Sequence, residues 1–113
     1  MDDSVLSTMI NREIGRIIVN NEKNICEEDD EYVLAYPFNL GYQRFRMSEI
    51  ECPNLLEITL EGVKFMLDNP DKSQHINVER QDGTGVLALK IENNALIIDD
   101  LVNYQTLGRI FLG

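Results

Sequence analysis

The densest set of reactive groups in the chain is a run of consecutive acids that precedes an apolar segment. The run comprises Glu27, Glu28, Asp29, Asp30 and Glu31. Neighbouring carboxylates can bind a divalent cation, supply a general acid and base, or attract a cationic surface. A dedicated calcium loop also requires a glycine at its sharp turn, and the run contains none. We therefore expect no dedicated metal site there.

The remaining nucleophiles and metal ligands are scattered. His75 is the single histidine, and no serine or cysteine motif accompanies it. Cys26 and Cys52 have no histidine or second cysteine beside them, so we expect free thiols and no transition-metal site. The segment 82–85, Asp-Gly-Thr-Gly, lies between two strand-like stretches. It indicates a turn, because a phosphate loop would be followed by a helix that begins with Lys-Ser or Lys-Thr.

Paired carboxylates are the other pattern with chemical meaning. Glu49 with Glu51 and Asp99 with Asp100 are two such pairs. A glycosidase site would place such a pair in a cleft that binds sugar, and the chain has no tryptophan and few aromatic residues to line one. The sequence thus predicts no catalytic residue and no cofactor, and an enzyme with an unrecognised carboxylate site is the minority alternative.

Charge is the strongest global signal in the sequence. Twenty acids against ten bases give a net charge of −10. Phosphate backbones and anionic lipid surfaces repel such a chain, whereas a basic protein is attracted to it. No apolar stretch approaches the roughly 20 residues of a membrane span, and the acidic N-terminus does not resemble a secretory signal. We expect a cytoplasmic protein that binds neither nucleic acid nor membrane.

Two segments show the spacing of amphipathic helices. In the first, about residues 3–20, the apolar positions recur with a helical period, and Gly15 weakens the pattern. The second covers about residues 53–69, where Leu56, Leu60, Val63 and Leu67 form the predicted buried stripe. A strand over residues 55–60 is the competing interpretation, and the helix is favoured because the pattern holds for three turns.

The other segments alternate as strands do. Residues 32–38 and 42–47 predict a hairpin, and residues 75–80, 85–92 and 95–99 predict three strands joined by turns. The tail allows either a short helix over 101–107 or an edge strand at 109–112. The whole chain, 1–113, is therefore predicted to be a single α+β domain in the order α-β-β-α-β-β-β. About five antiparallel strands form a sheet that two helices cover on one side, with a C-terminal helix as an option.

The acids and two nearby tyrosines suggest an interaction surface, since aromatic contacts add affinity and charge adds speed and orientation. The predicted partner-binding residues are Glu27, Glu28, Asp29, Asp30, Glu31, Tyr32, Tyr36, Glu49, Glu51, Asp99 and Asp100. The alternative is a solvated acidic loop that serves solubility, with both tyrosines facing the core.

The leading functional hypothesis is a small acidic binding protein or inhibitor that neutralises a basic protein. An immunity protein that blocks a cationic nuclease toxin would act in this way, with carboxylates in the place of substrate phosphates. The alternative from another class is a non-catalytic subunit or adaptor of a larger assembly, including a homodimer formed through an edge strand.

Overall fold

The computed structural model describes residues 3–37, 44–46, 54–71 and 74–113. Within these ranges the chain forms two α-helices, one short 3-10 helix and six strands. They are α1 (Asp3–Asn21), η1 (Glu22–Asn24), β1 (Tyr32–Pro37), β2 (Arg44–Arg46), α2 (Leu55–Asp68), β3 (His75–Arg80), β4 (Gly85–Glu92), β5 (Ala95–Asp100) and β6 (Gln105–Phe111). The predicted α+β class is confirmed. The C-terminal segment, for which a helix was an option, forms the sixth strand.

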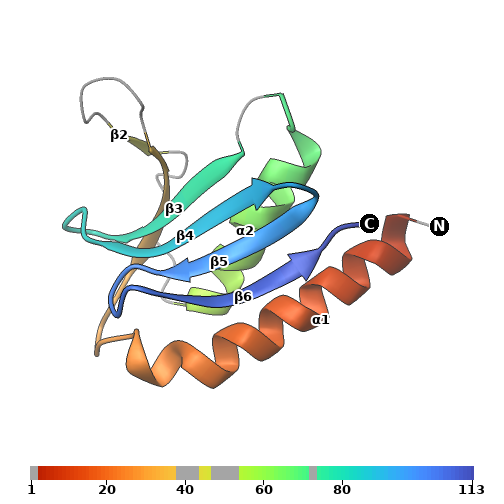
Figure 1. The fold of residues 1–113 in the computed structure, drawn as a ribbon. Helices are drawn as coiled ribbons and strands as arrows, with labels where there is room; N and C mark the ends of the chain where they lie inside the picture. The colour runs from red at the N-terminus through yellow and green to blue at the C-terminus, as the bar shows by residue number, and fades with distance from the viewer. Residues whose placement is uncertain (1–2, 38–43, 47–53, 72–73) are drawn as a thin grey trace.

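All six strands belong to one antiparallel sheet, in the spatial order β2-β1-β3-β4-β5-β6 (Figure 1). β3 to β6 follow one another as a meander. β1 is the direct neighbour of β3 in the sheet, although β2 and α2 separate these two strands along the chain. The β4–β5 turn is tight because Asn93 and Asn94 both have positive φ, at 51° and 62°, a conformation that asparagine tolerates well. The Asp-Gly-Thr-Gly segment is a turn, as predicted, with Gly83 at φ 89°.

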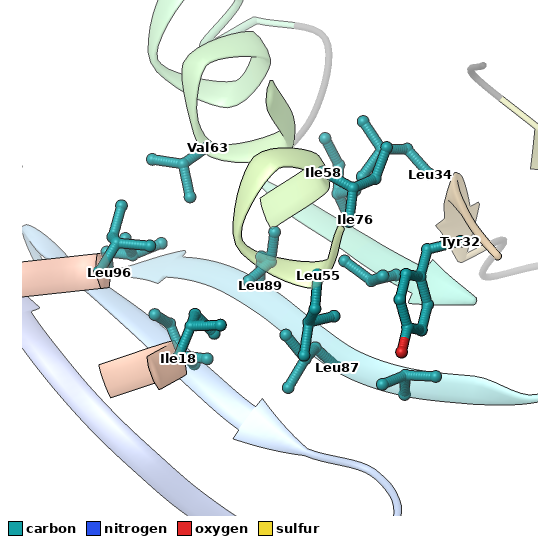
Figure 2. Close-up of a cluster of buried hydrophobic side chains, with 14 of the residues drawn as sticks. Ile18, Tyr32, Leu34, Leu55, Ile58, Val63, Ile76, Leu87, Leu89 and Leu96 are labelled. Atoms are coloured by element: carbon teal, nitrogen blue, oxygen red, sulfur yellow. The ribbon is translucent and has the colours of Figure 1, made fainter. Parts of the chain in front are cut away.

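Both helices pack on the same face of the sheet, which we call the helix-covered face. The strands supply alternate apolar side chains to it, and the helices supply Ile14, Ile18, Ile58 and Met66. Figure 2 shows part of this core, with Ile58 of α2 and Leu89 of β4 among the side chains that lie between α2 and the sheet. Because antiparallel strands present successive residues to opposite faces, the apolar alternation in the sequence becomes one continuous core.

The α2 helix forms where the second stripe predicted it, but it is rotated from the expected orientation. Asn54 caps it by accepting a hydrogen bond from the Glu57 N–H at 3.0 Å. Leu67 is 40% exposed, whereas Gly62 and its neighbours one turn away are buried. A Cβ at Gly62 would lie 3.0 Å from Leu34 and from Leu89. Because Gly62 has no Cβ, α2 can approach Leu34 and Leu89 closely at this point.

The α1 helix buries Ile10, Ile14 and Ile18, as its stripe predicted, while Met9 is 54% exposed. Among the described residues, no helix combines the length and the apolar character needed to cross a membrane.

Alanine should have different effects on stability at the two helical glycines. Gly15 lies within α1 and has no neighbouring atom within 4 Å of a built Cβ. Gly15→Ala should therefore raise the free energy of unfolding by about 0.5–1 kcal/mol, because alanine restricts the unfolded chain and favours the helix. Chemical denaturation measures this. Gly62→Ala is the matched comparison and should bring a smaller gain or a loss; an equal gain would contradict the close packing of α2.

Candidate functional site

The acidic run forms an ordered turn between η1 and β1, and we call residues 27–31 the acidic turn. The Asp30 N–H donates to the Glu27 carbonyl at 3.2 Å, and the Glu27 N–H donates to the Asp30 carboxylate at 2.8 Å. Asp29 has φ 64°, in the left-handed region that aspartate tolerates better than most residues. The turn is therefore closed by two reciprocal hydrogen bonds, and it is more than a run of solvated charge.

Asp30 is the residue that fixes the acidic turn to the sheet. Its carboxylate accepts hydrogen bonds from Arg80 Nε at 3.1 Å and from the Tyr32 hydroxyl at 3.0 Å. Arg80, at the end of β3, also donates to the Ile25 carbonyl at 2.9 Å. Both charged side chains are largely buried, at 11% exposed for Asp30 and 13% for Arg80. This ion pair joins residues fifty positions apart in the chain.

The hydrogen bonds to Asp30 also decide its protonation. Burial by itself would raise the pKa of Asp30, but hydrogen bonds from the Glu27 backbone, Arg80 and Tyr32 outweigh it. The pKa of Asp30 therefore lies below its usual value. Asp30 is consequently a fixed anion at neutral pH, with its charge neutralised inside the protein.

Cys26 and Tyr32 stand beside this pair without the properties of catalytic groups. Burial raises the pKa of the half-buried Cys26 thiol, although a hydrogen bond with Tyr32 opposes the shift. Burial also raises the pKa of Tyr32, and its hydrogen bonds with Cys26 and Asp30 add to that shift. Since the thiolate is the reactive form of cysteine, a thiol held protonated is a poor nucleophile.

A shallow hollow of about 430 Å³ adjoins the acidic turn. Its lining residues are Glu22, Cys26, Glu27, Asp29, Asp30, Tyr32, Asn54 and Leu55. In the described part of the chain, no three or more His, Cys, Asp or Glu side chains are grouped so as to hold a metal ion. The hollow therefore combines negative charge with one apolar wall, where Leu55 begins α2.

No family model, curated protein or solved structure matches this chain.

The structure separates the predicted contact residues into an exposed group and a buried group. Glu27, Glu28, Asp29 and Glu31 are exposed on the acidic turn. Tyr32 is only 1% exposed and belongs to the core. Tyr36 is partly buried and packs edge-to-face on Phe65, with ring centroids 6.0 Å apart. Both tyrosines therefore follow the alternative in which they face inward, and Tyr32 is corrected to a structural residue.

Asp99 and Asp100, predicted as one surface pair, point to opposite faces of the sheet. Asp100 is 1% exposed and accepts hydrogen bonds from the backbone N–H groups of Val102 and Asn103 at 2.9 and 3.0 Å. It organises the β5–β6 turn, so its assignment to a partner surface is corrected. Asp99 pairs with Lys90 at 3.2 Å and accepts from the Thr106 hydroxyl at 2.8 Å. Glu49 and Glu51 lie outside the described residues.

Sequence reasoning missed Arg80, whose ion pair with Asp30 fixes the acidic turn to the sheet. Its only local signal was a basic residue at the end of a strand, and nothing in the sequence pairs that residue with Asp30.

His75 also has a specific neighbour, since its Nε2 lies 3.0 Å from the Asn77 Oδ1. Burial lowers the pKa of His75, although the Asn77 hydrogen bond opposes the shift.

Proposed function

We propose that this protein binds a basic protein partner through the exposed side of the acidic turn. The observation that carries the proposal is the arrangement of Glu27, Glu28 and Asp29, which project from a turn held by two reciprocal hydrogen bonds and by Arg80. Carboxylates on an ordered backbone lose less conformational freedom on binding than those on a flexible loop. An ordered acidic surface is therefore better suited to docking than a run retained for solubility.

The sign of the charge indicates the class of partner. Nucleic acids and anionic lipids are repelled by a chain of net charge −10, whereas Lys and Arg side chains are attracted to it. Arg80 pairs with Asp30 at 3.1 Å and lies 4.0 Å from the carboxylate of the exposed Glu27. Between described residues, no ion pair reaches Glu28 or Asp29, so their charges remain available to a partner. A cationic nuclease whose phosphate-binding site accepts carboxylates would be a partner of this kind, and the protein would then act as its inhibitor.

Charge substitution on the acidic turn tests the proposal. The double variant Glu28→Lys with Asp29→Asn reverses one exposed charge and removes another, and asparagine retains the tolerance for positive φ at position 29. We expect it to weaken capture of a basic protein from a lysate of the source organism by at least about 10-fold, because close interfacial charge pairs contribute more than 1 kcal/mol each. Affinity capture followed by mass spectrometry measures this.

A matched control separates the position of the charges from the net charge. Glu61→Lys with Asp68→Asn makes the same charge change at two exposed positions of α2. This control should capture the partner as the unsubstituted protein does, and capture by either should fall as salt is raised. If both variants lost capture equally, or if neither lost it, the acidic turn would be excluded as the binding surface.

A further inference from the structure

The β6 strand forms one edge of the sheet, and its hydrogen-bonding pattern shows which groups face outward. The Leu112 N–H, just after β6, donates to the Asn94 carbonyl at 2.8 Å. Inward and outward groups alternate along an antiparallel strand, so the N–H and C=O groups of Arg109 and Phe111 point away from β5. Within the described ranges, no backbone hydrogen bond from another segment reaches these two residues.

The edge carries few of the features that prevent strands from pairing. Proteins protect exposed edges with prolines, with several charged residues or with a covering segment. β6 has no proline and one charged residue, Arg109, while Phe111 is 73% exposed. The α1 helix runs alongside β6 (Figure 1), and it approaches from the helix-covered face, where a Cβ on Gly108 would lie 2.5 Å from Ile17. The described contacts therefore cover one face of β6, and they include no backbone partner for the outward groups of Arg109 and Phe111.

The distribution of charge favours a second copy of the chain as the occupant of this edge. All twenty acidic side chains lie within residues 1–100, and Arg109 is the one charged side chain in residues 101–113. Two copies of a protein with net charge −10 repel each other through most surfaces. The two acids that pair in register with β6 are already engaged, since Asp100 is 1% exposed and Asp99 pairs with Lys90. Contact through β6 therefore brings few unpaired carboxylates together.

We propose that β6 pairs antiparallel with β6 of a second copy about a two-fold axis, so that the two sheets become one continuous sheet. An antiparallel strand pair is compatible with such symmetry, because each copy offers the other the same donors and acceptors. Phe111 of each copy then lies on a strand that is paired on both sides, which reduces the exposure of its ring.

Substitution of proline for Arg109, whose N–H faces outward, tests the pairing. Arg109→Pro removes an N–H that the proposed dimer requires, whereas Arg109→Val removes the same charge and retains the donor in a good strand former. In sedimentation equilibrium, the unsubstituted protein and Arg109→Val should form dimers with a dissociation constant below about 100 μM. Arg109→Pro should be monomeric at the same protein concentrations. A monomeric unsubstituted protein up to about 1 mM would overturn the proposal. Dimerisation of a folded Arg109→Pro to the same extent would also overturn it.

A second variant decides the question if Arg109→Pro does not fold. Phe111→Glu changes a residue that is 73% exposed and adds an acid to the edge. We expect it to remain folded by circular dichroism and to dimerise at least about 10-fold more weakly. Salt gives an independent measurement, because screening of the net charge should strengthen the dimer while it weakens capture of a basic partner. A dimer unaffected by Phe111→Glu, or weakened by salt, would contradict pairing through β6.

Discussion

Leu89→Ala should lower the free energy of unfolding by about 3 kcal/mol, since truncation of a buried leucine removes apolar contacts and leaves a cavity. Leu89 is fully buried on β4, in register with Ile76 on one side and Ile98 on the other. The helix α2 already lies close to the sheet at Gly62, so it cannot move inward to fill the cavity. Helix and strand backbones are held on both sides of the site, so we expect little compensating movement.

Urea denaturation, monitored by circular dichroism, measures the effect of Leu89→Ala. Leu67→Ala is the matched control, because Leu67 is 40% exposed on α2 and its truncation should cost less than about 1 kcal/mol. The comparison also tests the orientation of α2, for which the sequence predicted Leu67 on the buried stripe. Equal losses in the two variants would mean that α2 is rotated back toward the predicted orientation.

Asp30→Asn should lower the free energy of unfolding by about 2 kcal/mol at neutral pH, because it leaves a largely buried Arg80 without its carboxylate. Asparagine has nearly the same shape as aspartate, so the change isolates the charge. The neighbouring Asp29→Asn is an identical chemical change at an exposed position and should stay within about 0.5 kcal/mol of the unsubstituted protein. Thermal and chemical denaturation of the three proteins measure the difference.

The effect of Asp30→Asn should depend on pH in a defined direction. The pKa of Asp30 is lower in the folded protein than its usual value, so its contribution to stability is complete above the usual carboxyl range. That contribution disappears as the pH falls through the usual value, about 4, toward the folded pKa. The gap between the unsubstituted protein and Asp30→Asn should therefore close in acid. A gap independent of pH would show that the charge of Asp30 does not cause it.

Most of the fold could be predicted because periodicity in this sequence is strong. Ile10, Ile14 and Ile18 marked the buried side of α1, and alternation in residues 75–99 marked three strands of the meander. The rotation of α2 could not be predicted in this way. Apolar periodicity is judged from large side chains such as leucine, and it does not reveal that Gly62 faces the sheet. The choice between helix and strand in the tail was equally open, because pairing with β5 decides it and β5 lies outside that segment.

The candidate site could be predicted only in part, for a related reason. The run of acids was evident, but a sequence does not show which member of a run turns inward. Asp30 does so because Arg80 ends β3 opposite Tyr32, a register that depends on pairing between β1 and β3. Asp100 was placed on the surface for its charge, but it is buried, because its carboxylate accepts hydrogen bonds from four donor groups of Val102, Asn103 and Gln105 around the β5–β6 turn.

The position of β1 between β2 and β3 has a consequence for synthesis on the ribosome. α1, β1 and α2 all precede β3 in the chain, yet β3 is the strand that joins β1 to the meander. At about 5–20 residues per second, the N-terminal part waits several seconds for the strands that complete its core. During that interval Ile14, Leu34 and Ile58 remain accessible to chaperones, so the nascent chain should depend on them more than the finished protein does.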